Sequence, residues 1–233
     1  MFSRSRRLAW LAGTALSLSL SPAAHSVEPG GDPGAGLPGA GLPGAGLAAV
    51  GDPAIGAKKF YTCYGCHGIE NYKNAYPDYN VPKLRHQTAS YLIAALREYR
   101  SGERPHATMH AQAISLSDQD MADIAAYLQG SEPIKPGTAV GGKAPEQVAA
   151  CTACHGGNGT GTGQPITPTP PILAGQHEDY LEHALTAYRN GRRKNAVMGS
   201  MSQLLKTEDD IKTAAEYFAG QPSNLHTATI DSK

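Results

Sequence analysis

The sequence predicts an all-α protein in which two similar helical domains follow one another along the chain. Apolar residues recur at helical spacing behind recognisable caps, and no period-two strand pattern of any length is present. The chain also repeats itself, because residues 51–233 divide into two halves that can be aligned with each other. We place the two domains at 51–138 and 139–233.

Residues 1–26 are typical of a signal peptide. Three arginines between positions 4 and 7 precede an apolar run at 8–20, and Ala24-His25-Ser26 places small residues at the cleavage site. The run is short for a membrane span, so we expect cleavage, with an uncleaved N-terminal anchor as the alternative. Without this segment the chain has 17 basic and 20 acidic residues. That balance is unlike the basic surface of a nucleic-acid binder, so no nucleic-acid partner is expected.

Residues 27–50 are rich in proline, glycine and alanine, and Pro-Gly-Ala-Gly-Leu occurs three times between positions 33 and 47. Such a composition buries too little apolar surface to offset the entropy lost on ordering, so we expect a flexible segment. Two interpretations stay open. In the first, the segment reaches toward a partner or toward a membrane surface, and the latter would give peripheral membrane association. In the second, it is a flexible terminal segment that is tolerated without a role of its own.

The first domain is expected to contain three helices. One begins at Asp52-Pro53, one runs from Thr88 or Ser90 to Gly102, and one follows a capping box at 117–120. The inward faces of the last two are Leu92, Ile93, Leu96 and Tyr99, then Met121, Ile124, Tyr127 and Leu128. The second domain repeats this order with helices expected at 145–150, 178–190 and, after the cap Thr207, 208–219.

Matching positions in the two domains keep the same offset from a proline. The first set is Pro82-Lys83-Leu84, Gln87, Tyr91-Leu92, Leu96, Tyr99-Arg100, Gly102 and Met109. The second set is Pro171-Ile172-Leu173, Gln176, Tyr180-Leu181, Leu185, Tyr188-Arg189, Gly191 and Met198. The proline and the methionine are 27 residues apart in both, which indicates duplication of one domain.

Each domain contains one Cys-x-x-Cys-His motif, at Cys63-Tyr64-Gly65-Cys66-His67 and at Cys151-Thr152-Ala153-Cys154-His155, and the two motifs use all four cysteines. This pattern is the signature of covalently attached haem c, because two thiols add to the two vinyl groups of a porphyrin while the adjacent imidazole binds its iron. Two motifs predict two haem c groups. The alternatives are a zinc site built from the same cysteines and a thioredoxin-like redox pair, which would need a βαβ pattern that is not visible.

We expect each iron to be held by a histidine and a methionine, a common ligand pair in c-type cytochromes. His67 and His155 are the first ligands. Met109 and Met198 are the second, because they occupy matching positions, and we expect loops to carry them. A thioether ligand in a buried site raises the reduction potential, so both potentials are expected to be positive.

Several other side chains compete for the second ligand position. Met121 belongs to a helix face and is expected in the core, and Met201 matches Gln112 in the first domain. His106 and His110 would give a bis-histidine haem, but they match Asn195 and Gly199, so we interpret them as surface loop residues.

Two further pairs of matching residues are candidates for supporting roles. Pro82 and Pro171 lie where a backbone carbonyl could accept from the ligand histidines, although a proline before a helix is also ordinary turn chemistry. Arg100 and Arg189 end the middle helices, where the helix dipole favours a cation, or they contact a haem propionate.

The motifs quoted above resemble those of tandem class I cytochrome c domains in the dihaem cytochrome c4 family of bacterial periplasms, over about residues 51–220. The resemblance implies two domains related by a pseudo-twofold axis, with haem propionates facing each other near the interface. It implies a periplasmic electron carrier between a respiratory donor and a terminal oxidase or another acceptor. The first domain departs at Arg85-His86, where the second has Ala174-Gly175, and in a Tyr- and Asn-rich segment at 67–82.

Closed His/Met shells favour electron transfer over catalysis, so redox proteins such as a membrane-bound oxidase, reductase or dehydrogenase are the expected partners. Two rival functions remain. One is an electron-transfer subunit of a larger dehydrogenase complex. The other is a dihaem redox enzyme, which would need an open iron or a ligand such as thiolate, and no cysteine is spare.

Overall fold

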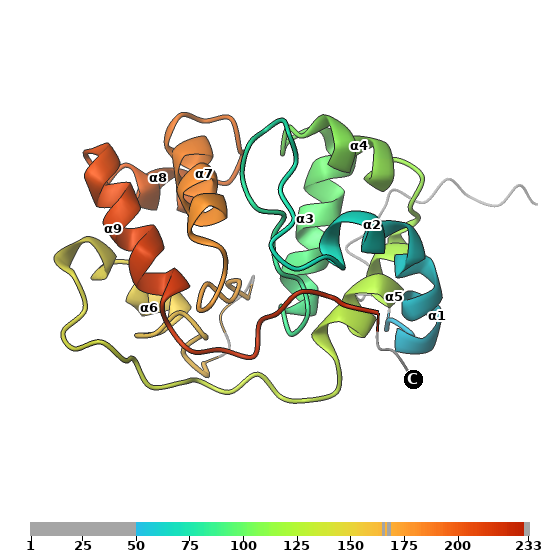
Figure 1. Ribbon diagram of the computed structural model, residues 1–233, viewed down its shortest axis with the longest axis horizontal. Coiled ribbons are helices and arrows are strands. Elements are labelled where there is room, and N and C mark those ends of the chain that lie inside the picture. The colour runs from blue at the N-terminus through green and yellow to red at the C-terminus, as the bar shows by residue number, and fades with distance from the viewer. Residues whose placement is uncertain (1–49, 165, 167–168, 231–233) are drawn as a thin grey trace, which may run out of the picture. The chain divides into compact units, whose positions relative to one another are not determined.

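The computed structural model describes residues 50–164, 166 and 169–230, which all belong to the compact unit Ala45–Lys233. Within these residues the regular structure is helical, with two isolated bridge pairs, Lys73–Asn80 and Arg85–His226 (Figure 1). The expected signal peptide and nearly all of the proline-rich segment lie outside the described residues. Across the described ranges, no helix combines the length and the apolar character needed to cross a membrane.

Both repeats contain the same series of short and long helices. The first comprises α1 (Pro53–Lys59), η1 (Phe60–Cys63), α2 (Tyr64–His67), α3 (Ala89–Ser101), α4 (Ala107–Ala113) and α5 (Asp118–Gln129). The second comprises η2 (Glu146–Val148), α6 (Thr152–His155), α7 (Glu178–Arg189), α8 (Ala196–Ser202) and α9 (Glu208–Ala219). Residues 131–145 join the repeats without regular structure.

The helix boundaries follow from the capping residues in the sequence. The Asp52 carboxylate accepts from the backbone N–H groups of Ala54 and Ile55 at the start of α1. Capping boxes begin α5 and α9, and Gly102 ends α3 with φ of 83°. The prediction of a helix at 145–150 was wrong, since only a 3₁₀ turn forms there, and α2, α4, α6 and α8 were not predicted.

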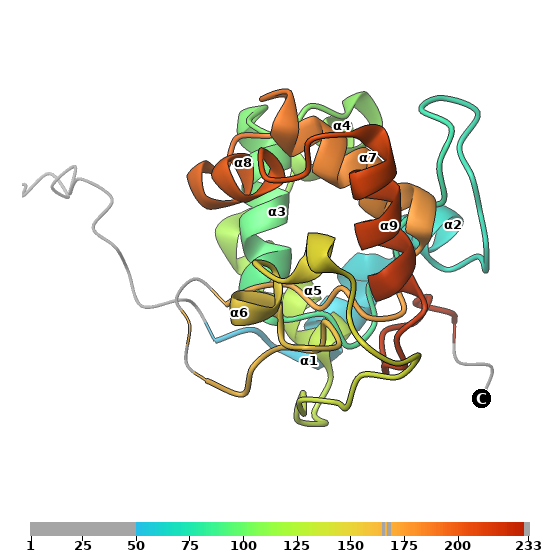
Figure 2. The ribbon, with the colours of Figure 1, turned by 90° about the vertical axis from the view of Figure 1, so that its left-hand side faces the viewer.

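Each repeat has a small apolar core around its longer helices. In the first repeat α1 and α3 both pack on α5, around buried Phe60, Leu92, Ile124 and Leu128. Gly56 lets α1 approach closely, because a Cβ there would lie 2.0 Å from the Asp123 carbonyl oxygen. The second core includes Val148, Leu181, Ile211 and Phe218, where α7 and α9 lie side by side (Figures 1 and 2). Full burial of one such side chain stabilises the fold by about 1.5–3 kcal/mol.

The two repeats also exchange segments, so they contact each other as expected. Tyr79, from the Tyr- and Asn-rich segment of the first repeat, packs into the second core. Its ring stacks on that of His183, with the ring centroids 4.2 Å apart. In return, the chain after α9 crosses to the first repeat, as its red ribbon near α5 shows (Figure 1). There Ala228 is fully buried in the first core and its N–H donates to the His67 carbonyl.

Candidate functional site

Local helical structure gathers the reactive side chains of each Cys-x-x-Cys-His motif. The first motif bridges η1 and α2, and the second is formed by Cys151 and α6. Residues three and four apart share one face of a helix, so in each motif both thiols and the imidazole lie on the same side. All four cysteine side chains are half-buried, and none of them forms a disulfide.

The two motif histidines have closely matching surroundings. His67 and His155 are buried, and each places Nδ1 3.0 Å from a proline carbonyl oxygen, that of Pro82 and of Pro171 respectively. The predicted role of the prolines is thereby confirmed. A ring that donates from Nδ1 keeps the Nε2 lone pair for a metal.

Burial keeps both imidazoles neutral at ordinary pH. Desolvation lowers the pKa of His67 to about 4, although the hydrogen bond to Pro82 opposes this shift. Desolvation likewise lowers the pKa of His155, against the hydrogen bond to Pro171. Because only the neutral ring binds a metal, both histidines are in the ligating form.

The candidate methionines lie in short helices and not in loops, which corrects the expectation from sequence. Met109 is the third residue of α4 and Met198 the third residue of α8. The helices form because the preceding side chains cap them. His106 Nδ1 accepts from the Met109 N–H at 3.2 Å, and Asn195 Oδ1 accepts from the Met198 N–H at 2.9 Å.

The interpretation of His106 and His110 as surface loop residues was also wrong. His106 is the cap described above and is half-buried. His110 lies in α4, with Nδ1 2.8 Å from the Tyr99 carbonyl oxygen. Among the competing methionines, Met121 is fully buried in the helix α5 as expected, whereas Met201 is 37% exposed on α8.

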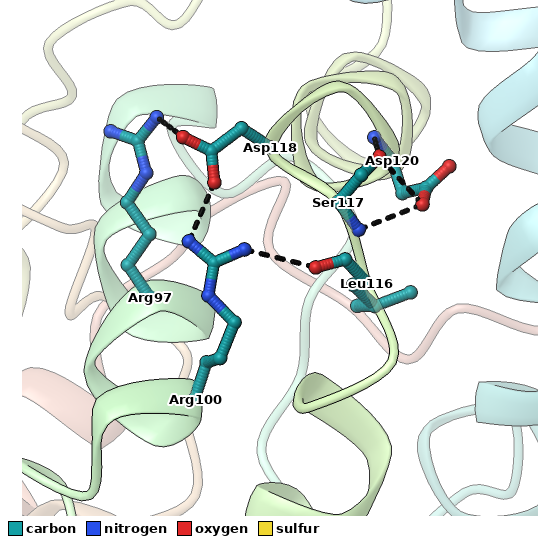
Figure 3. A network of polar contacts seen from close by, with 6 residues as sticks. All are labelled: Arg97, Arg100, Leu116, Ser117, Asp118 and Asp120. Carbon is teal, nitrogen blue, oxygen red and sulfur yellow. Dashed lines mark hydrogen bonds and ion pairs between the residues drawn. The ribbon is translucent and has the colours of Figure 1, made fainter. Parts of the chain in front are cut away.

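Arg100 and Arg189 connect the middle helix of each repeat to the start of the last. Arg100 donates to the Leu116 carbonyl at 2.9 Å and pairs with Asp118, which Arg97 also contacts (Figure 3). Arg189 makes the matching contacts to the Leu205 carbonyl and Glu208. These contacts explain both arginines without a haem propionate.

A second pair of arginines, which the sequence analysis missed, is buried close to the contact between the repeats. Arg104 and Arg193 lie 22 residues after Pro82 and Pro171, and they are only 4% and 7% exposed. Arg104 donates to the hydroxyls of Tyr91 and Tyr180. The shared offset from the prolines was the signal that could have found them.

The positive charge of this pair is poorly balanced. Among the described residues the ion pair of Arg104 is with Glu98 at 3.8 Å, and no ion pair is found for Arg193. Arg104 Nη1 and Arg193 Nε are buried without a hydrogen-bond partner. Both arginines line a cavity of about 310 Å³ with Tyr99, His106 and Tyr180. A buried guanidinium is costly without an anion, so this cavity fits a group that carries carboxylates.

The zinc alternative finds no support in the arrangement of donors. Within the parts of the chain that the structure describes, no three or more His, Cys, Asp or Glu side chains are grouped to hold a metal ion. The two cysteine pairs belong to separate repeats, each beside its own histidine. Each repeat has a neutral histidine that can bind iron beside a pair of cysteines, and a buried arginine that can bind a carboxylate. These features define a c-type cytochrome with two haem sites.

Comparisons with known proteins agree with this class. The cytochrome c family model matches residues 54–132 and 142–221. Cytochrome c4 of Pseudomonas aeruginosa is 36% identical over 180 residues, 71% of this chain and 86% of that protein. A thiosulfate dehydrogenase electron acceptor of Thiomonas intermedia is 39% identical over 177 residues, 69% of this chain and 79% of the relative. Reduced recombinant cytochrome c4 from Pseudomonas stutzeri superposes with a TM-score of 0.57 at 32% identity, covering 74% of this chain and all of that one.

The chain belongs to the dihaem cytochrome c4 family. Its two tandem cytochrome c domains bind two covalent haem c groups, and it carries electrons between redox proteins and is not an enzyme. The all-α fold, the two cofactors and the electron-carrier function predicted from sequence are thereby confirmed.

Proposed function

We propose that each iron is held by the motif histidine of its repeat and by the methionine of the following short helix. These pairs are His67 with Met109 and His155 with Met198, and the thioether bonds are made by Cys63, Cys66, Cys151 and Cys154. The observation that carries the proposal is the duplicated arrangement. In both repeats a proline carbonyl holds the histidine and an equivalent cap fixes the N–H of the methionine.

Haem c supplies an iron that gains or loses one electron. The protein has to keep the structural rearrangement around the iron small when this happens. A closed shell of two protein ligands leaves no position for a substrate. The buried histidines and half-buried methionines support such a shell. The domains that carry these shells are residues 51–138 and 139–233.

Arg104 and Arg193 are proposed to hold the haem propionates. They are buried cations with unpartnered donor atoms, and propionates are the carboxylates that a haem brings. The tyrosine hydroxyls around Arg104 would complete the hydrogen bonding at this position. This assignment replaces the sequence-based suggestion of Arg100 and Arg189.

The proposed location is the bacterial periplasm, after removal of residues 1–26 as a signal peptide. Haem c is attached outside the bacterial cytoplasm, and residues 1–26 have the three regions of an export signal. The proposed partners are a respiratory donor and a membrane-bound oxidase, reductase or other acceptor. A second candidate role is to accept electrons from a thiosulfate dehydrogenase, which the similarity to the Thiomonas protein favours.

The ligand proposal is tested by the weak long-wavelength absorption band of oxidised haem bound to methionine sulfur. Met109→Ala and Met198→Ala should each remove about half of this band while two haems per chain remain attached. Met201→Ala is the matched control, because Met201 lies in the same helix as Met198 but is exposed, and it should leave the band unchanged. An unchanged band in Met109→Ala or Met198→Ala would refute that ligand.

Mixing the oxidised protein with a purified thiosulfate dehydrogenase and thiosulfate and, separately, the reduced protein with a terminal oxidase tests the two candidate roles. Rapid haem oxidation by the oxidase supports the respiratory role. Rapid haem reduction by the dehydrogenase with thiosulfate supports the second.

A further inference from the structure

Two buried glutamines reach across the contact between the repeats, and each holds one backbone residue of the other repeat. Gln87 Nε2 donates to the Ile172 carbonyl at 3.0 Å, and its Oε1 accepts from the Ile172 N–H at 2.8 Å. Gln176 makes the same pair of bonds to Lys83, at 3.0 and 2.9 Å. Both side chains are nearly inaccessible, at 3% and 5% exposed.

The residues held by the glutamines directly follow the prolines that orient the haem histidines. The Ile172 N–H and the Pro171 carbonyl belong to one peptide group, and that carbonyl accepts from His155. The Lys83 N–H and the Pro82 carbonyl are related in the same way, with His67. Each glutamine is therefore two hydrogen bonds away from the histidine of the opposite repeat.

Hydrogen bonds that share a peptide group strengthen one another. When a glutamine oxygen accepts from the N–H, the peptide group becomes more polarised, and its carbonyl oxygen becomes a stronger acceptor. A stronger acceptor at Nδ1 makes the imidazole a more electron-rich ligand, which favours the oxidised iron.

We infer that Gln87 and Gln176 are positioning residues that tune the reduction potential of the haem in the opposite repeat. Gln87 acts through Pro171 on His155, and Gln176 acts through Pro82 on His67. The inference rests on the proposed ligation of the irons by these two histidines. It links the contact between the repeats to the electronic state of both haems.

The inference predicts the sign of the change as well as the haem affected. Loss of the glutamine weakens the carbonyl acceptor and raises the potential of the opposite haem. Simple loosening of the contact would instead admit water near the haems, and exposure of a haem favours the oxidised state and lowers the potential. The two explanations therefore differ in direction.

The test uses the holoprotein with Gln87→Met or Gln176→Met, since methionine is close to glutamine in shape. In the reduced protein labelled with ¹⁵N-histidine, Gln87→Met should move the Nδ1–H proton resonance of His155 upfield and leave that of His67 in place. The equilibrium of the second-repeat haem should shift about threefold toward the reduced form, about 28 mV at 59 mV per tenfold. Gln176→Met should give the mirror image.

Gln221→Met is the matched control. Gln221 is 5% exposed and makes the same two bonds to one backbone residue, Val140, which does not follow a histidine-binding proline. It should cost comparable stability and shift neither histidine. Gln87→Glu provides a second variant, because its carboxylate still accepts from the Ile172 N–H, and it should lower the potential of the second-repeat haem.

Several results would overturn the inference: a shift confined to the haem of the mutated repeat, equal or downward shifts at both haems in the methionine variants, or no difference from Gln221→Met. If Gln87→Met does not fold, Gln87→Glu becomes the deciding variant. An unchanged potential of the second-repeat haem in Gln87→Glu would also contradict the inference. Failure of the proposed ligation is recognised separately, since the unmutated protein would then lack the two iron-bound histidine resonances.

Discussion

The two haem sites share one frame but differ in the residues placed around it. Both keep the histidine bonded to a proline carbonyl, and in both the crossing glutamine, the methionine helix and the buried arginine lie at equal offsets from that proline. They differ beyond that frame. Glu98 lies beside Arg104, whereas the matching position near Arg193 is Ala187, and the helix caps are His106 and Asn195. The shared residues are those proposed to hold the cofactors, while the differing ones change local charge.

The segments after the two motifs differ most. In the first repeat the segment docks on α7, where Asn80 and Lys73 both contact the Asp179 carboxylate at about 3 Å. In the second, buried Asn158 and Thr160 hold the chain that joins the repeats, through the Gly137 N–H. The first segment therefore fastens the two repeats together, and the second fastens the connection between them.

The largest effect is expected when one haem cannot attach. Each domain has only about 90 residues, too few for a large core, so the haem supplies much of the apolar surface to be packed. Cys63→Ala with Cys66→Ala should leave one haem per chain and make the first repeat sensitive to protease. Tyr79 of the first repeat lies in the core of the second, and Ala228 of the second repeat lies in the core of the first, so the second repeat should also lose stability. Unchanged protease resistance would contradict this dependence.

The next largest effect is expected from the buried arginines. Replacing either with glutamine removes a cation near the haem carboxylates and should lower a haem potential, on the order of 1 kcal/mol. Arg193→Gln should lower it more than Arg104→Gln, because loss of Arg104 raises the pKa of the Glu98 carboxyl further and protonation of Glu98 then offsets part of the lost charge. A spectroelectrochemical titration of both variants checks the order. Equal shifts would show that Glu98 does not distinguish the sites.

A smaller, pH-dependent effect is expected from Glu98 itself. Burial raises the pKa of the Glu98 carboxyl, although Arg104 and Arg193 oppose that shift and Glu103 adds to it. Ionisation as the pH rises places a negative charge beside Arg104 and favours the oxidised haem. One potential should therefore fall as the pH increases through this raised pKa. Glu98→Gln should abolish the fall, as measured by titrations at a series of pH values.

The smallest effect is expected at the helix starts, where Asp120 and Asp210 complete similar capping boxes. Lys59 and Ser117 lower the pKa of Asp120 to about 2. Its unfolded pKa is about 3.9, so its contribution is complete above that value and is lost as the pH falls from about 4 to 2. Asp120→Asn should cost up to about 1 kcal/mol at neutral pH. Denaturant unfolding at pH 7 and at pH 2 should show that the cost disappears in acid.

The sequence predicted the elements that depend on local chemistry. The caps at Asp52, Ser117 and Thr207 fixed three helix starts, because side-chain hydrogen bonds to nearby N–H groups act within a few residues. The Cys-x-x-Cys-His motifs and the proline carbonyls were found for a similar reason. Their function depends on spacing, and the duplication repeats the spacing within each motif, while the histidine and its proline are 15 residues apart in the first repeat and 16 in the second.

Features that depend on contacts between distant residues were not predicted. Two local signals were missed as well, because the Asn195 cap of α8 was overlooked and the His106 cap of α4 is not a recognised one. The glutamine contacts and the exchange of Tyr79 and Ala228 join residues far apart in sequence, so no local pattern announces them. The buried arginines Arg104 and Arg193 were visible as a matching pair, but nothing in the sequence distinguished them from Arg100 and Arg189 at the ends of α3 and α7.

Two closed His/Met haems with related but unequal surroundings are proposed to carry single electrons through this protein. A potentiometric titration of the purified protein, followed through the haem absorption bands, tests this proposal most directly. Two haems per chain are expected to titrate in two one-electron steps, both at positive potentials and separated from each other. A haem that titrates well below zero, or one that is high-spin when reduced, would contradict it.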